Sequence, residues 1–169
     1  GIFTKYLLKE KQVGTIVSSV VASQSLDEIV SDKGGNLIKT DVNSVLSEID
    51  ANNAVFGGDE PDMYIFPKFQ TCFDGIFAVM KMLEIMAQED TTLSNLAKGI
   101  KEYNRTGFTI ECEHDKKDEV IEIFKTKFEF GKNINTIDGI RVDLEDSFLL
   151  IRPSRFEPLI RVYIESKKA

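Results

Sequence analysis

The strongest constraint on the fold is the order of predicted elements in the first half of the chain. There, short runs rich in β-branched and apolar residues alternate with segments of helical periodicity. Strands are predicted at 15–22, 36–40 and 54–56, and helices at 25–33 and 43–52. This alternation implies right-handed crossovers onto a parallel layer. We therefore predict a three-layer α/β domain over residues 1–90, built on a small mixed or parallel sheet.

The order of elements changes after residue 90. The polar stretch QEDTTLSN at 88–95 is the best candidate for a domain boundary. Beyond it the pattern predicts helices at 92–103 and 115–128, and strands at 107–112, 140–144, 148–152 and 159–164. The last three strands have no helices between them. Helices segregated from an antiparallel sheet predict an α+β domain over residues 91–169.

The segment DGIFAVMKMLEIMAQ, residues 74–88, has apolar side chains around most of its helical circumference. A helix that is apolar on nearly all sides is typical of a protein interior. We therefore predict that this helix is well buried.

Charge and cysteine content exclude several classes of function. A net charge of −7 argues against general nucleic-acid binding, and a phosphate site would need a local cluster of cations. The chain has no apolar run long enough to span a membrane and does not start like a signal peptide. Cys72 and Cys112 match no metal spacing and are too few for a disulfide scaffold. These features predict a cytoplasmic protein without nucleic-acid or membrane partners.

The motif RPSRFEP at 152–158 lies between two strand-like apolar runs. Arginine donates paired hydrogen bonds to phosphate, and a turn with a serine hydroxyl and backbone N–H groups can bind an anion. Arg152, Ser154 and Arg155 are therefore candidates for an anion site. A solvated connecting turn is the alternative, because turns commonly contain proline, serine and charged residues.

The motif FGGDEPD at 56–62 follows another predicted strand. Its glycines permit a close approach of backbone to a ligand, and Asp59, Glu60 and Asp62 could accept hydrogen bonds from sugar hydroxyls. A solvated acidic loop is the alternative. The spacing matches neither a calcium-binding loop nor a nucleotide-phosphate loop, so no metal site is predicted. His114 is the single histidine and has no nearby nucleophile in the sequence, so no catalytic residue is predicted either.

Together, FGGDEPDMYIFPKFQTCFDGIFAVMKMLE and DGIRVDLEDSFLLIRPSRFEPLIRVYIE resemble the C-terminal half of the α-D-phosphohexomutases, the phosphoglucomutase/phosphomannomutase family. The similarity extends to SSVVASQSLDEIVSDKGGNLIKTDV and covers nearly the whole chain. It implies that residues 1–90 are like the family's third domain. It also implies that residues 91–169 are like its fourth, TBP-like domain.

The resemblance also implies the chemistry of a larger protein. Family members move a phosphoryl group between the 1- and 6-positions of a hexose, using a phosphoserine in the first domain and a magnesium-binding loop in the second. Neither is present in this sequence. The resemblance therefore implies that Mg²⁺ binds in the absent second domain, that no cofactor binds this chain, and that the chain alone is inactive.

The family's site residues carry over only in part. Arg152, Ser154 and Glu157 match the phosphate loop, Arg155 stands in place of asparagine or glycine, and Phe156 replaces a threonine. The resemblance implies phosphate binding by the four residues Arg152, Ser154, Arg155 and Glu157.

In the sugar loop at 57–63, Asp59 occupies the position of a glutamate. Pro61, Asp62 and Met63 replace the serine, glycine and histidine of the usual pattern. The resemblance implies sugar binding by Gly58, Asp59 and Glu60.

The functional hypothesis that follows is substrate recognition. The chain would bind a hexose phosphate as part of a phosphoglucomutase/phosphomannomutase-type enzyme, together with the N-terminal domains of the same protein. A non-catalytic relative, acting as a phosphosugar-binding or interaction module, is the alternative that the altered loop positions suggest.

Overall fold

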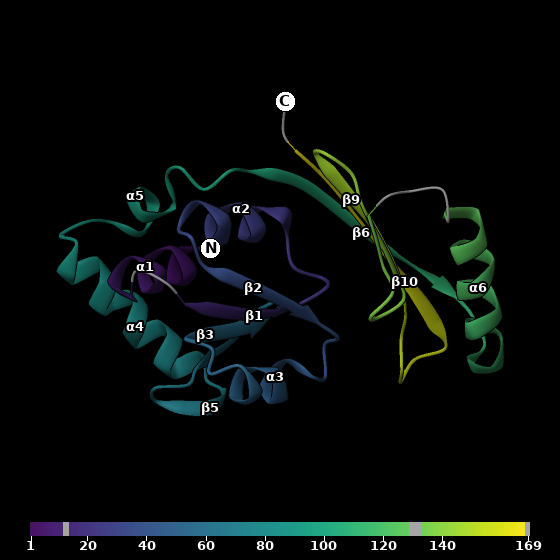
Figure 1. The fold of residues 1–169 in the computed structure, drawn as a ribbon, viewed down its shortest axis with the longest axis horizontal. Coiled ribbons are helices and arrows are strands. Elements are labelled where there is room, and N and C mark those ends of the chain that lie inside the picture. Colours follow the sequence, from purple (N-terminus) through teal and green to yellow (C-terminus); the bar gives the residue numbers. More distant parts are fainter. Residues whose placement is uncertain (12–13, 129–132, 168–169) are drawn as a thin grey trace. The chain divides into compact units, whose positions relative to one another are not determined.

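The computed structural model describes residues 1–11, 14–128 and 133–167, and the chain forms two compact units (Figure 1). The first unit is Gly1–Lys101 and the second is Glu102–Ala169. The boundary between the units along the chain therefore lies at 101/102, whereas the composition of the sequence indicates a boundary at 90/91. Each unit is described by itself below.

The first unit contains a five-stranded mixed sheet with the strand order β2-β1-β3-β4-β5. Its strands are β1 (Thr15–Ser19), β2 (Asn36–Thr40), β3 (Phe56–Asp59), β4 (Met63–Phe66) and β5 (Gln70–Phe73). Strand β1 pairs in parallel with β2 and β3, as the alternation of strands and helices predicts. Strands β4 and β5 add two antiparallel pairings that the sequence analysis missed. They follow one another without a helix, so no change of periodicity marks them.

Helices cover both faces of this sheet. They are α1 (Ile2–Lys11), α2 (Gln24–Asp32), α3 (Val45–Ala51), α4 (Gly75–Gln88) and α5 (Leu93–Ala97). Side chains of α1, α2 and α4 pack around Ile16 on one face, and side chains of α3 pack around Val17 on the other. Figure 1 shows α2 and α3 on opposite sides of the sheet. Ile16 and Val17 are adjacent in β1 and therefore point to opposite faces of the sheet, so the helices form one layer on each side of it. The three-layer α/β prediction is confirmed.

Helix α4 carries an exposed apolar stripe, formed by Ile76, Val79, Met80 and Leu83, whose exposed fractions are 80%, 62%, 62% and 59%. Only Ala78 and Ile85 of this helix are buried. The prediction of a well-buried helix is therefore wrong for this chain. Apolar periodicity shows that a helix has more than one face suited to packing, but it does not show which faces this chain covers.

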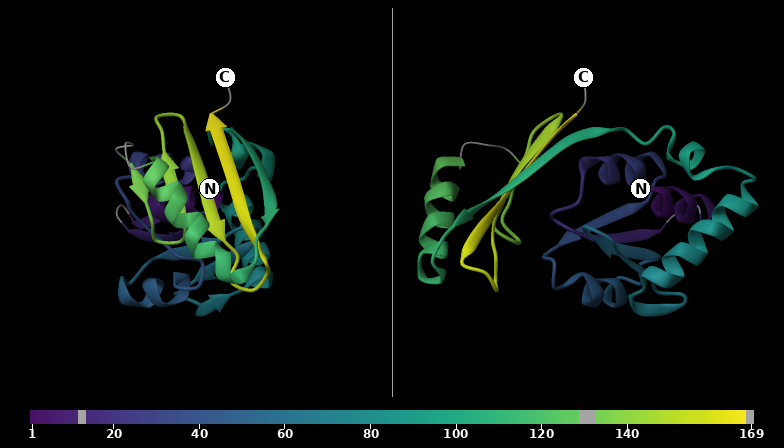
Figure 2. Two further views of the ribbon diagram at one scale, coloured as in Figure 1. Left: turned by 90° about the vertical axis from the view of Figure 1, so that its right-hand side faces the viewer. Right: turned by 180° about the vertical axis from the view of Figure 1, so that it is seen from behind.

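The second unit is a five-stranded antiparallel sheet with the order β6-β10-β9-β8-β7. The strands are β6 (Tyr103–Glu111), β7 (Ile134–Asn135), β8 (Ile140–Asp143), β9 (Ser147–Pro153) and β10 (Leu159–Lys167). The short helix η1 (His114–Lys116) leads into α6 (Lys117–Phe128), which packs on one face of the sheet (Figure 2). The prediction of an antiparallel α+β architecture is confirmed.

The segment predicted as a helix at 92–103 is helical only over Leu93–Ala97. From Tyr103 onward the chain forms β6, whose residues pair with β10 up to the register Tyr103–Lys167. This partner lies far away in the sequence, so local periodicity gives no indication of it.

No helix within the described residues is long and apolar enough to cross a membrane.

Candidate functional site

The predicted sugar loop begins in the central strand of the first unit, because β3 lies between β1 and β4. Ser18 of β1 donates its hydroxyl hydrogen to the carbonyl oxygen of Gly58, at 2.9 Å. A Cβ atom on Gly58 would lie 2.5 Å from the carbonyl oxygen of Met63. Glycine at this position therefore permits the tight pairing of β3 with β4 that places the loop.

Hydrogen bonds hold the carboxylate of Asp59 in place. Its Oδ1 atom accepts from the hydroxyl of Ser19 at 2.5 Å and from the N–H of Glu60 at 2.8 Å. Ser19 is fully buried, and its oxygen also accepts from the N–H of Val21 at 3.2 Å. Two bonds to the same oxygen fix the direction of the carboxylate. Sequence reasoning missed Ser19, because its bond to Asp59 joins two strands that are distant in the chain.

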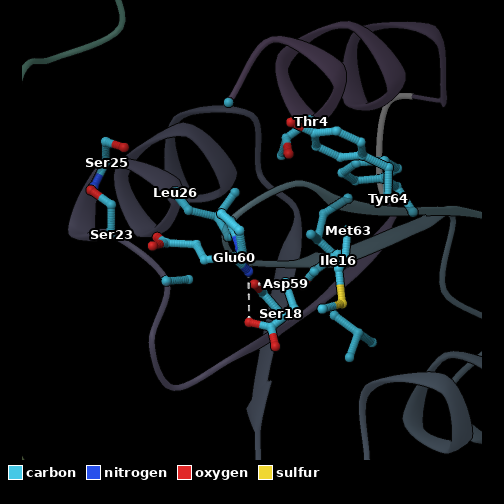
Figure 3. A pocket seen from close by; sticks show the side chains of 16 residues that line it. Thr4, Ile16, Ser18, Ser23, Ser25, Leu26, Asp59, Glu60, Met63 and Tyr64 are labelled. Carbon is cyan, nitrogen blue, oxygen red and sulfur yellow. Dashed lines mark hydrogen bonds between the residues drawn. The ribbon is translucent and has the colours of Figure 1, made fainter. Parts of the chain in front are cut away.

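A pocket of about 200 Å³, lined by both polar and apolar side chains, lies beside this loop (Figure 3). Its lining includes hydroxyl groups and carboxylates from four elements or their ends, among them Thr4, Ser18, Ser23, Ser25, Asp59 and Glu60. The hydroxyl oxygen of Thr4 is buried and has no hydrogen-bond partner within the described residues. Hydroxyl and carboxylate groups together can both donate to and accept from a ligand. The pocket is thus chemically suited to a small polyhydroxyl compound.

Tyr64 lines the same pocket from β4. Burial raises the pKa of its hydroxyl, and the negative charge of Asp62 and a hydrogen bond to that carboxylate raise it further. The hydroxyl donates to Oδ1 of Asp62 at 3.4 Å. Tyr64 is therefore a neutral hydrogen-bonding group at the edge of the pocket.

The predicted phosphate loop connects β9, the central strand of the second unit, to its neighbour β10. Strands β9 and β10 pair with Arg152 directly opposite Arg161, and the N–H of Ser154 donates to the carbonyl of Leu159 at 3.0 Å. Residues between these positions form a compact turn at the end of the hairpin. The corner lies between two paired strands, as the apolar runs on either side of it predict.

Arg152 is held by a residue that the site prediction did not include. Its Nε atom donates to Oδ2 of Asp138 at 2.6 Å, and only 13% and 6% of the two side chains is exposed. Asp138 reaches Arg152 because Gly139 lies against β9: a Cβ atom on Gly139 would be 2.2 Å from the carbonyl oxygen of Ile151. The sequence contains a sign of this arrangement in the DG pair that precedes β8.

The remaining predicted residues divide between the interior and the surface of the turn. Ser154 is buried, and its oxygen accepts from the N–H of Glu157 at 3.3 Å. The carboxylate of Glu157 pairs with Arg161. Arg155 and Phe156 are exposed. Of these residues only Ser154 is buried, while Arg155, Phe156 and Glu157 are exposed at the surface of the turn.

The structure brings Gly58, Asp59 and Glu60 together in the first unit, and Arg152, Ser154, Arg155 and Glu157 together in the second. Among the residues described, no group of three or more histidine, cysteine, aspartate or glutamate side chains could hold a metal ion.

A mixed α/β unit followed by an antiparallel α+β unit matches the third and fourth domains of the phosphohexomutases. A crystal structure of a phosphoglucomutase/phosphomannomutase family protein from Burkholderia thailandensis aligns with a TM-score of 0.85 at 22% identity. That alignment covers 99% of this chain and 36% of the other. An N-acetylglucosamine-phosphate mutase in a product complex aligns with a TM-score of 0.66 at 15% identity. At such identities, these similarities describe the fold alone.

Residues 1–103 match the family model described as phosphoglucomutase/phosphomannomutase, alpha/beta/alpha domain III. The chain belongs to the phosphoglucomutase/phosphomannomutase family.

Two relatives have a higher sequence identity to this chain. A protein of Methanopyrus kandleri named "Probable phosphoglucosamine mutase" is 35% identical over 170 residues. The phosphoglucosamine mutase of Methanococcus aeolicus is 32% identical over 172 residues. Each alignment covers 99% of this chain and 38% of the relative. The chain therefore spans well under half the length of these relatives.

Proposed function

We propose that this chain is the substrate-recognition half of a phosphohexomutase that interconverts hexose 1-phosphates and hexose 6-phosphates. The names of the relatives add glucosamine phosphate as a substrate to test first. The observation that carries the proposal is the fixed position of Arg152 at the end of β9, where Asp138 holds its Nε. An arginine with one edge anchored keeps its other N–H groups directed for an anion.

The proposal gives each polar loop its own role. Arg152, Ser154 and Arg155 bind the phosphate that does not react, and Glu157 shapes their turn through its bonds to Ser154 and Arg161. Gly58, Asp59 and Glu60 bind the sugar hydroxyls. Binding energy from the phosphate that does not react positions the reacting end of the substrate, which is how a part without catalytic groups contributes to rate.

The partner in this proposal is the rest of a full-length mutase. The relatives are much longer than this chain, and the α4 stripe presents contiguous apolar side chains suited to packing against another domain. The phosphoryl-transfer groups and a Mg²⁺ site would belong to that other part. The cytoplasmic location remains a prediction from composition.

Calorimetric titration tests the proposal with glucosamine 6-phosphate, glucose 1-phosphate, mannose 6-phosphate and inorganic phosphate. Arg152→Ala should weaken binding of all four by at least about tenfold, because one or more charge-assisted hydrogen bonds are lost. Asp59→Asn should weaken binding of the three sugar phosphates and leave binding of inorganic phosphate unchanged.

Lys125→Ala is the matched control, because it removes one positive charge from an exposed pair with Glu122 on α6. It should leave all affinities within about twofold. Saturable binding that Arg152→Ala does not reduce would contradict the phosphate assignment. No binding of any sugar phosphate by the wild-type chain would overturn the recognition role and favour the interaction-module alternative.

A further inference from the structure

Lys117, the first residue of α6, has its ammonium group buried beneath the 154–158 turn. Only 4% of the residue is exposed. Its Nζ atom donates to the carbonyl oxygens of Ser154 and Glu157, at 2.6 Å each. The Nδ1 atom of His114 lies 3.1 Å from the same Nζ atom. One side chain from a helix thus binds both ends of the turn that connects β9 to β10.

The partners of Lys117 differ from those of three arginines in the second unit. Arg141, Arg152 and Arg161 pair with the carboxylates of Asp143, Asp138 and Glu157. The hydrogen-bond partners of Lys117 are two backbone carbonyls and an imidazole nitrogen, and none of them carries a full negative charge. No carboxylate of the described residues lies within ion-pair distance of its ammonium.

We infer that Lys117 is a positioning residue of the phosphate site: it holds the 154–158 turn in its binding shape and supplies buried positive charge beneath it. This inference rests on the proposed function for the identity of the ligand. The contacts of Lys117 with the turn stand independently of that function.

Two physical effects support this role. Desolvation of a cation is costly, so a buried lysine is held where several acceptors compensate for lost water. At Lys117 those acceptors are the carbonyls that define the turn. The field of a buried charge is also weakly screened, so that it favours an anion bound on the turn above it.

The backbone of the turn also contains a donor that an anion could use. The carbonyl of Glu157 accepts from the N–H of Leu159 at 2.8 Å in addition to Lys117. The exposed Phe156 has an N–H without a hydrogen-bond partner within the described residues. The carbonyls of Ser154 and Glu157 accept from Lys117, so the N–H group of Phe156 can donate to a bound anion.

Lys116 and Lys117 are neighbours in the sequence but have different environments in the structure. It lies on the surface, where it pairs with Glu113 at 2.5 Å, and 61% of its side chain is exposed. The run EHDKKDE reads as a solvated helix start, and nothing in it separates the two lysines. Because they carry the same charge at adjacent positions, Lys116→Met is a matched control for Lys117→Met.

The experiment uses the 169-residue chain with two readouts. The first is amide hydrogen exchange of Leu159 without ligand, with Val162 in the middle of β10 as an internal reference. The second is affinity for inorganic phosphate and glucosamine 6-phosphate. Lys117→Met should speed exchange at Leu159 relative to Val162 by at least about tenfold. It should also lower the affinity for each of the two ligands by at least about tenfold. Lys116→Met should change each by less than about twofold, and Lys117→Arg should restore part of both losses.

Each outcome decides a separate question. If Lys117→Met matches Lys116→Met in exchange at Leu159, the positioning role is overturned. If exchange rises but phosphate affinity is unchanged from wild type, the assignment of Lys117 to the phosphate site is overturned. If the wild-type chain and Arg152→Ala both fail to bind phosphate while exchange still rises in Lys117→Met, the proposed function fails and the contact with the turn is supported.

Discussion

The Nε atom of Arg152 lies 2.6 Å from Oδ2 of Asp138, and both side chains are almost fully buried. Arg152 is the penultimate residue of β9, and Asp138 precedes β8, the neighbouring strand. The pair therefore spans two strands at the edge from which the 154–158 turn extends. It fixes the direction of the arginine on which the proposed phosphate site depends.

Asp138→Asn should lower the free energy of unfolding of the second unit by about 1–3 kcal/mol, because a charge-assisted bond to a buried arginine is lost. Denaturant unfolding measures this. Asp146→Asn removes an exposed carboxylate that pairs with Lys167, and should change stability by at most about 0.5 kcal/mol. Equal effects of the two variants would mean that the buried pair contributes no more than a surface pair.

Gly139→Ala should be more destabilising than Gly99→Ala. Both glycines have positive φ, at 89° and 80°, but only at Gly139 would a Cβ atom meet backbone, 2.2 Å from the carbonyl of Ile151. Backbone conformation alone costs about 1–2 kcal/mol. The steric overlap adds to this at Gly139, so unfolding should show a loss above about 2 kcal/mol there. A smaller loss at Gly139 than at Gly99 would contradict the close approach of β8 and β9.

The Tyr64 hydroxyl should ionise above its ordinary value of 10.0, because burial, the charge of Asp62 and their hydrogen bond all raise its pKa. The folded chain then holds this proton more tightly than the unfolded chain. Its contribution to stability is complete below about pH 10 and is lost as pH rises through the raised pKa. Subtracting the tyrosinate absorbance titration of Tyr64→Phe from that of wild type isolates this group. Asp62→Asn should shift its midpoint downward; no shift would leave burial as the only cause.

Substitution of the α4 stripe should have little effect on the stability of this chain. Val79→Ser together with Leu83→Ser removes exposed methyl groups and should change the free energy of unfolding by at most about 0.5 kcal/mol per site. Ile85→Ser removes a fully buried side chain of the same helix and should cost about 2–5 kcal/mol. The double variant should also bind less of a hydrophobic fluorescent dye. A large loss of stability in the double variant would show that the stripe is covered.

The periodicity of the sequence predicted much of the fold for a simple reason. Strands β1, β2 and β3 are short apolar runs separated by helices, and that order restricts them to a parallel layer. Strands β9 and β10 lack a helix between them and pair as antiparallel neighbours. The failures have a common cause. The β4–β5 pairing and the start of β6 depend on which strand lies alongside, and the exposure of α4 depends on what packs against it.

The sequence by itself determined the fold class and the residue types available at the ends of β3 and β9. Backbone periodicity and turn chemistry are local properties, so they can be read from neighbouring positions. Only the tertiary structure decided the pairs Ser19–Asp59, Asp138–Arg152 and Lys117–Ser154. Each pair joins residues that are distant in the chain and meet only when two elements pack. The same packing buries Lys117 under the 154–158 turn, whereas its neighbour Lys116 stays on the surface.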